Sequence, residues 1–135
     1  MFDVAKILGG RQNVPETLEL PVTGGATYHV GEALVVTSGK LALAKGAVAV
    51  QYISLEEYVA PASGERKLKC FRVMPDQLFA VPVSVAPTAL LTGGKVQIGA
   101  DGLTVTATAA DTGGAEIVDL CNASKAGDKI LVVLK

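Results

Sequence analysis

Short runs of alternating apolar and polar residues, separated by glycine-containing turns, set the pattern of this chain. The run around which the chain is organised, 30–44, predicts two strands joined by a turn at Ser38-Gly39. The same arrangement returns over 93–107, and a third, partial copy covers 127–133. Consecutive β-hairpins are therefore the predicted scaffold.

Further strands are expected where short apolar runs lie between turn residues. The run 47–53 is apolar on both faces, which is typical of a central strand that is covered on both sides. The alternation over 67–73 shifts at Cys70, which predicts a β-bulge there. The other predicted strands are 17–22, 78–83, 115–120 and 129–134. Together they predict an all-β protein, a small β-barrel or sandwich built of hairpins.

The sequence allows at most two short helical turns. One covers 3–8, because the glycine pair that follows would end a helix. The other follows Ser54, since Ser54 and Glu57 match a capping box, in which each side chain accepts a hydrogen bond from the other residue's backbone N–H. Pro61 would limit the length of this turn.

Residues 1–20 differ in pattern from the rest and predict an extended N-terminal arm, which leaves 21–135 as a single β-rich domain. Val14 precedes Pro15 and is therefore restricted to an extended conformation. A fully extended arm of this length would reach about 60 Å at about 3.3 Å per residue, more than its own domain requires. The alternative is an ordinary edge strand folded back on the core.

Composition supports the β class and a single domain. A chain of 135 residues is long enough to bury one core. Half of the residues are hydrophobic, with an excess of alanine and valine, while aromatic residues make up only 4% and tryptophan is absent. Together with 15 glycines and 6 prolines, this composition favours sheets and tight turns over long helices.

The mean hydropathy of +0.43 is high for a small protein and predicts self-association. The strand 129–134 is apolar on both faces, so it lies inside the domain or at a subunit contact. We therefore expect a homo-oligomer, with a trimer as the expected form. The predicted interface residues are Ile130, Leu131, Val132, Val133 and Leu134.

No membrane partner is expected, because no apolar run approaches the ~20 residues that span a bilayer. The first ten residues lack the basic start and hydrophobic run of a secretory signal, so we expect synthesis in a cytoplasm. The triplet Asn122-Ala123-Ser124 matches a glycosylation site, but without a secretory signal it predicts a polar turn.

Twelve basic and thirteen acidic residues give a net charge of −1, which provides no long-range attraction for nucleic acid. The densest basic group is Arg66, Lys67, Lys69 and Arg72, with Phe71 beside them. A basic and aromatic stripe is able to contact nucleic acid, but a solvated strand face is the expected role. No nucleic acid partner is predicted.

Side chains able to carry out catalysis are scarce. His29 is the one histidine, and without a second histidine or a nearby cysteine a three-ligand metal site is difficult to assemble, so a surface histidine is expected. Glu56 and Glu57 are neighbours that do not face each other, so they do not share a proton. Cys70 and Cys121 are expected to be buried free thiols, with a disulfide as the alternative. We predict no catalytic, metal-binding or cofactor-binding residue, no cofactor, and no enzymatic activity.

A resemblance to capsid decoration (cement) proteins of tailed bacteriophages that infect Gram-positive bacteria rests on three segments. They are 1–20 (MFDVAKILGGRQNVPETLEL), 30–36 (VGEALVV) and 126–132 (AGDKILV). The resemblance implies a β-rich domain that binds the outside of the assembled phage head, commonly as a trimer, with its arm on the major capsid protein. It implies a place on the capsid exterior of the virion after synthesis in the host cytoplasm. The arm residues expected to contact the capsid are Phe2, Val4, Ile7, Leu8, Val14, Leu18 and Leu20.

Two other classes of protein are alternatives. A phage head-tail connector or tail-tube subunit is also β-rich and oligomeric, but it forms rings, commonly hexameric, so the native mass separates it from a trimer. A β-barrel carbohydrate-binding module usually presents aromatic platforms, and three tyrosines, three phenylalanines and no tryptophan argue against that class.

Overall fold

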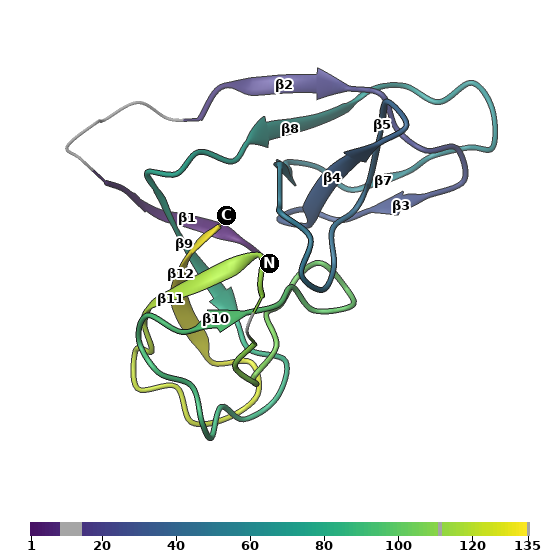
Figure 1. The fold of residues 1–135 in the computed structure, drawn as a ribbon. Coiled ribbons are helices and arrows are strands. Elements are labelled where there is room, and N and C mark those ends of the chain that lie inside the picture. The colour runs from purple at the N-terminus through teal and green to yellow at the C-terminus, as the bar shows by residue number, and fades with distance from the viewer. Residues whose placement is uncertain (9–14, 111, 135) are drawn as a thin grey trace.

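The computed structural model describes residues 1–8, 15–110 and 112–134 (Figure 1). In those ranges the regular structure consists of β-strands, without a helix. The first sheet contains, in spatial order, β1 (Asp3–Ile7), β9 (Gln77–Pro82), β12 (Lys129–Leu134), β11 (Ala115–Asp119) and β10 (Lys95–Val96). The second contains β2 (Thr17–Leu20), β8 (Leu68–Arg72), β6 (Tyr52–Ser54), β4 (Ala33–Thr37) and β5 (Lys40–Leu43). A separate pair joins β3 (Thr27–Tyr28) to β7 (Tyr58–Val59). The fold is all-β, as predicted.

The hairpin predicted over 30–44 is confirmed. β4 and β5 pair in a continuous antiparallel register. The two residues that connect them, Ser38 and Gly39, have φ angles of 51° and 77°. Positive φ at both positions is typical of a type I′ turn, whose twist matches the twist of the strands on either side.

The second predicted hairpin, 93–107, is only partly regular. Beyond β10, Ile98 and Val105 form a single antiparallel bridge. At the turn between them, the side-chain oxygen Oδ1 of Asp101 accepts a hydrogen bond from the backbone N–H of Leu103 (2.9 Å). This local bond offers the backbone an alternative to strand pairing, so the hairpin is shorter than the first.

Isolated bridges close the first sheet into a small barrel. Val105 forms a parallel bridge with Val83, which directly follows β9, and an antiparallel bridge with Ile98, which follows β10. The N–H of Val105 donates to the carbonyl oxygen of Pro82 (3.1 Å). Backbone pairing therefore runs from β9 through β12, β11 and β10 and returns to β9, which removes open edges from this part of the sheet.

The second sheet closes in a similar way. Val22, which follows β2, forms a parallel bridge with Leu41 of β5. The N–H of Leu41 donates to the carbonyl oxygen of Pro21 (2.8 Å). The chain that leaves β2 at one edge of the sheet therefore pairs with β5 at the other edge.

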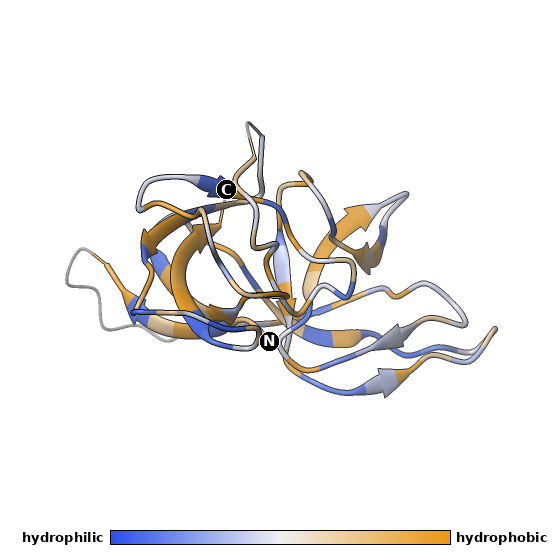
Figure 2. Cartoon of the chain, turned by 90° about the horizontal axis from the view of Figure 1, so that it is seen from below, coloured by the Kyte–Doolittle hydropathy of each residue, from blue (hydrophilic) through white to orange (hydrophobic). Residues whose placement is uncertain are grey.

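Two hydrophobic cores hold these sheets together, and hydrophobic positions concentrate along the strands (Figure 2). In the larger core, Phe79 of β9 stacks on Phe71 of β8, and Phe2 meets Phe79 edge-on. Strands of both sheets contribute to this core, so it joins the two sheets. The buried members of the smaller core are Val22, Tyr28, Leu34, Leu41, Ala60, Leu68 and Cys70.

The bulge predicted at Cys70 is not present in β8, a strand that the structure describes in full. β8 pairs continuously with both β2 and β6. Leu68 and Cys70 face the smaller core, while Phe71 faces the larger one. Because each face of β8 contributes a buried residue at this point, the consecutive apolar residues Cys70 and Phe71 require no shift in register, and the prediction of a bulge was wrong.

Neither helical turn that the sequence allows forms in the described ranges, and β1 replaces the first of them. At the second, Ser54 lies in β6, and its N–H donates to the carbonyl oxygen of Glu32 (3.0 Å). Glu57 therefore has no access to that N–H, and its Oε1 accepts a hydrogen bond from the N–H of Val30 (3.1 Å). Pairing within the sheet thus replaces the capping box. β6 overlaps the predicted strand 47–53 only at Tyr52 and Ile53. Residues 47–51 lie outside the strands and 47–49 are exposed, so the prediction of a strand covered on both faces was wrong for them, although β6 itself lies centrally, between β4 and β8.

The described part of 1–20 lies against the domain. β1 is an edge strand that pairs with β9, and β2 pairs with β8. Phe2 is only 2% exposed, and its N–H donates to the carbonyl oxygen of Gly31 (2.9 Å). These segments correspond to the alternative stated above, strands folded back on the core.

Candidate interaction surfaces

The structure separates the arm residues that the sequence assigned to capsid contact. Four of them pack on the chain's own cores: Phe2, Val4, Leu18 and Leu20. Ile7 is half-buried at the end of β1, and Leu8, which follows it, is exposed. Val14 lies outside the described residues. Leu8 is therefore the described member whose side chain is exposed. Ile7 is half-buried, as Val4, Leu18 and Leu20 are, but it belongs to neither core.

The predicted interface residues of β12 divide between its two faces. Ile130, Val132 and Leu134 are buried in the larger core. Leu131 and Val133 are half-buried on the opposite face, because side chains alternate along a strand. Only these two of the five face away from the chain's own core.

Leu131 and Val133 lie on a face of the first sheet where apolar and charged residues mix, since Asp119 also lies opposite Leu131 and Asp3 lies opposite Ala80. Leu131 lies opposite the half-buried Ala80 of β9, and Val133 lies opposite Glu116 of β11. Val118, which lies at a register shift between Ile117 and Asp119, is 40% exposed. We call Ala80, Val118, Leu131 and Val133 the outer apolar face. Its burial against another protein would remove apolar surface from water.

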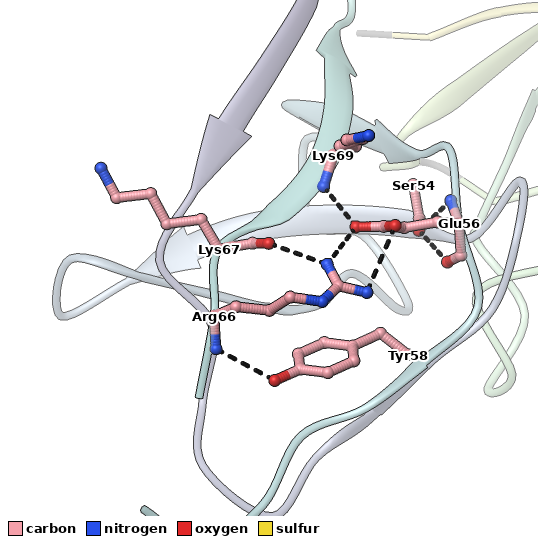
Figure 3. Close-up of polar contacts among 6 residues, drawn as sticks. All are labelled: Ser54, Glu56, Tyr58, Arg66, Lys67 and Lys69. Atoms are coloured by element: carbon pink, nitrogen blue, oxygen red, sulfur yellow. Dashed lines mark hydrogen bonds and ion pairs between the residues drawn. The ribbon is translucent and has the colours of Figure 1, made fainter. Parts of the chain in front are cut away.

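A polar cluster joins β8 to the segment between β6 and β7 (Figure 3). Glu56 accepts hydrogen bonds from Nη1 of Arg66 (2.7 Å) and from the backbone N–H of Lys69 (2.9 Å). The guanidinium of Arg66 lies over the ring of Tyr58, 4.1 Å from its centre. The hydrogen bond from Arg66 lowers the pKa of the Glu56 carboxyl, since a positive donor favours the charged form. The cluster thus compensates the charge of Arg66 locally.

The basic residues around β8 do not form a stripe with Phe71. Phe71 is buried in the larger core, away from the surface that carries the charges. Arg72 lies over the ring of Tyr52, 5.7 Å from its centre, and Lys69 lies opposite Glu19 of β2. This surface carries mixed charge, which agrees with the expected solvated strand face.

The two adjacent glutamates have different partners, as predicted. Glu56 bonds Arg66, whereas Oε2 of Glu57 lies 2.9 Å from Nδ1 of His29. The side chain of His29 is 48% exposed, so the prediction of a surface histidine is confirmed. The hydrogen bond from the N–H of Val30 lowers the pKa of Glu57.

A groove that the sequence did not predict lies beside His29. Its volume is about 380 Å³. It is lined by the side chains of Tyr28, Leu41, Leu43 and Leu103 and by two carboxylates, Glu32 and Asp101. We call it the Glu32 groove. The sequence carried one signal for it, the acidic residue Glu32 at the start of an apolar strand. Acidic residues are also common at exposed strand ends, so this signal does not identify a groove.

The two cysteines are free thiols in different environments. Cys70 is buried, as predicted, and burial raises the pKa of its thiol to about 11. Cys121 is exposed, so the prediction of burial was wrong for this residue. It lies in a turn in which Cys121 and Asn122 both have positive φ, 51° and 57°. The polar turn predicted at Asn122 is thus confirmed.

Metal-ligating side chains do not cluster in the described part of the chain. No three His, Cys, Asp or Glu side chains there come together in a way that could hold a metal ion. The same residues include no helix with the length and hydropathy to cross a bilayer.

The architecture is that of an all-β protein in which short antiparallel strands form two small, laterally closed sheets around a shared core. No protein-family model and no curated protein matches the sequence. Among solved structures, the chain is similar to the N base of the head fiber gp8.5 of bacteriophage phi29, with a TM-score of 0.56 and 14% identity. The alignment covers 89% of this chain and 95% of that chain. At this level of identity, the similarity shows a shared fold.

Proposed function

We propose that this chain is a structural protein of a phage virion, which binds the outside of the assembled head and stabilises it. The observation that carries the proposal is the fold similarity to the phi29 head fiber N base, which extends over nearly the full length of both chains. Function does not follow from fold alone, so the proposal also rests on the surfaces described above. Their residues serve binding to proteins in this proposal, and no catalytic step is assigned to them.

The proposed assembly is a homotrimer formed in the host cytoplasm through the outer apolar face. Leu131 and Val133 contribute apolar surface, and Val118 adds a side chain that is already 40% exposed. In a cyclic trimer the contacts run head to tail, so the outer apolar face of each copy would pack against a different surface of the next copy.

The proposed contact with the major capsid protein lies at the end of β1. Phe2 anchors the start of this segment in the larger core, while Ile7 and Leu8 retain accessible surface. β1 is also an edge strand, and a strand of another protein is able to pair with such an edge through backbone hydrogen bonds. Three linked subunits would bind the head together, which raises the effective affinity above that of one contact.

Co-sedimentation with phage heads that lack this protein tests the proposal. We expect the purified chain to bind such heads to saturation and to raise their resistance to heat. The variant Leu8→Asp should weaken binding, whereas Leu91→Asp, at a loop residue that is 74% exposed, should bind like the wild type.

Native mass spectrometry of the free protein tests the oligomer. A trimer is the expected species. A hexameric ring would instead favour the head-tail connector or tail-tube alternative. A monomer that does not sediment with heads would contradict both the proposed assembly and the proposed function.

A further inference from the structure

The Glu32 groove brings together three segments that are distant in sequence. β3 supplies Tyr28, β5 supplies Leu41 and Leu43, and the turn after β10 supplies Leu103. Glu32 itself directly precedes β4. Most of the lining is apolar, so the carboxylates stand out as polar groups in an otherwise hydrophobic wall.

Glu32 is buried with one of its oxygens lacking a donor. The residue is 3% exposed, and its Oε2 accepts a hydrogen bond from the N–H of His29 (3.2 Å). Oε1 accepts no hydrogen bond from the residues that the structure describes, and it is not fully enclosed, so it can be reached from the groove. A carboxylate in such surroundings is stabilised by a donor that enters from outside.

Charged groups of both signs act on this carboxylate. Burial raises the pKa of Glu32, and the nearby Glu57 and Asp101 raise it further, while His29 acts in the opposite direction. No lysine or arginine lines the groove within the described part of the chain. The side chain of His29 lines the groove, and the ammonium of Met1 donates to the carbonyl oxygen of Leu103 (2.6 Å). Neither of these two groups donates a hydrogen bond to Glu32 in the described part of the chain, so its Oε1 has no cationic partner there.

We infer that the Glu32 groove binds a lysine side chain of a partner protein. The ammonium group donates to Oε1 of Glu32, and the methylene stem lies against Leu43 and Leu103. A lysine fits this chemistry because it joins a compact, strongly donating cation to four apolar carbons. The inference needs only the groove, and it holds whether or not the partner is a phage head.

Other cations fit the groove less well. A metal ion would need several ligands, and the described residues provide no such group here. A short diamine carries a second cation, but Glu57 and Asp101 both act on Glu32 itself, so the negative charges gather around one point. The second ammonium would then lie against the leucine side chains, which is unfavourable without a partner.

Methyl NMR with a blocked amino acid tests the inference directly. Nα-acetyl-lysine N-methylamide should shift the methyl signals of Leu43 and Leu103 with a Kd of about 1 mM, the range expected for one charged contact with limited apolar burial. The Nε-acetylated form keeps the stem and loses the charge, so it should bind at least about tenfold more weakly. Putrescine is the matched free diamine and should also bind more weakly than the blocked lysine.

Two variants locate the contact. Glu32→Gln keeps the size of the side chain and should weaken binding of the blocked lysine about tenfold, whereas Glu16→Gln, at an exposed residue outside the groove, should leave binding unchanged. The methyl spectrum itself reports whether each variant is folded.

The pH dependence supplies an independent measurement. As the pH rises, binding of the blocked lysine should strengthen over the range in which the side-chain 13C signal of Glu32 shows its ionisation. The side-chain signals of His29, Glu57 and Asp101 are followed separately, because these groups act on the same carboxyl. Equal binding of the Nε-acetylated form, unchanged binding to Glu32→Gln, or tighter binding of putrescine would each overturn the inference.

Discussion

The rings of Phe71 and Phe79 stack across the contact between the two sheets, with centroids 6.3 Å apart and planes within 3° of parallel. Phe79 is fully buried, and Phe71 is 6% exposed. Each residue comes from a different sheet, so this pair couples the packing of one sheet to the packing of the other. The two sheets should therefore unfold as one cooperative unit.

Replacing Phe79 by alanine tests that coupling. The variant should lose about 3–5 kcal/mol of unfolding free energy, because it removes a fully buried aromatic side chain and leaves a cavity. Urea unfolding should still show a single transition when followed by far-UV and near-UV signals. Val85→Ala, at an exposed loop residue, is the control and should change stability by less than about 0.5 kcal/mol. Two separate transitions in the wild type would contradict the coupling.

The turn between β4 and β5 gives a second prediction. Gly39 has a φ of 77°, and a methyl group added to its Cα would meet no neighbouring atom within 4 Å, so Gly39→Ala introduces backbone strain without a clash. We expect a loss of about 1 kcal/mol, measured by thermal or urea unfolding. Ser38→Asn should instead stabilise the protein by roughly a few tenths of a kcal/mol, since asparagine tolerates the positive φ of a type I′ turn. A loss in both variants would exclude the assigned turn geometry.

Glu32 should make the protein less stable as the pH rises. Its pKa in the folded state is raised above the ordinary value of 4.5, chiefly by burial, so the folded state binds the proton more tightly than the unfolded state does. The free energy of unfolding therefore decreases as the pH rises from that ordinary value through the folded pKa. Glu32→Gln cannot ionise and should lack this decrease. Urea unfolding at a series of pH values measures it, and parallel profiles for the two proteins would contradict the assignment.

Glu56 should have the opposite effect over an acidic pH range. Its pKa is lowered, first by the hydrogen bond from Arg66, so its stabilisation is complete above the ordinary pKa and is lost as the pH falls through the folded pKa. Glu56→Gln should cost about 0.5–1 kcal/mol at neutral pH, since the pair is partly exposed to solvent. The difference from the wild type should disappear in acid. Glu16→Gln provides the exposed control, and an equal loss at all pH values would show that charge is not the cause.

The outer apolar face gives a prediction about assembly. Leu131→Asp places a charge in the proposed subunit contact and should dissociate the oligomer, because burying an unpaired carboxylate is unfavourable. Sedimentation velocity measures the mass, and circular dichroism verifies the fold. Val85→Asp, at a loop residue that is exposed, should retain the mass of the wild type. An oligomer that persists in Leu131→Asp would place the contact elsewhere.

Strands whose partners are close in sequence could be predicted well. The hairpin of β4 and β5 follows from alternation and from the Ser38-Gly39 turn, and the predicted bounds of the strand 129–134 coincide with those of β12. Both depend on local signals. The parallel bridges Val22–Leu41 and Val83–Val105 could not be predicted, because each joins distant segments through very few hydrogen bonds.

The candidate sites were harder to predict for the same physical reason. The capping-box pattern at Ser54 is a local signal, but pairing with Glu32 in the sheet overrides it. The apolar pattern of 129–134 correctly predicted a strand. Because both faces of that strand are apolar, the pattern does not indicate which face of β12 packs on the chain's own core. The Glu32 groove depends on three segments that meet only in the folded protein, so no single stretch of sequence contains its signature.

The central place of β12 in the first sheet has a consequence for biosynthesis. β12 lies between β9 and β11, although the ribosome makes residues 129–134 well after β9. The nascent chain therefore exposes the apolar side chains of β9 until β12 has been made. This half of the protein matures only after β12 has left the exit tunnel, and until then it is a natural client for chaperones.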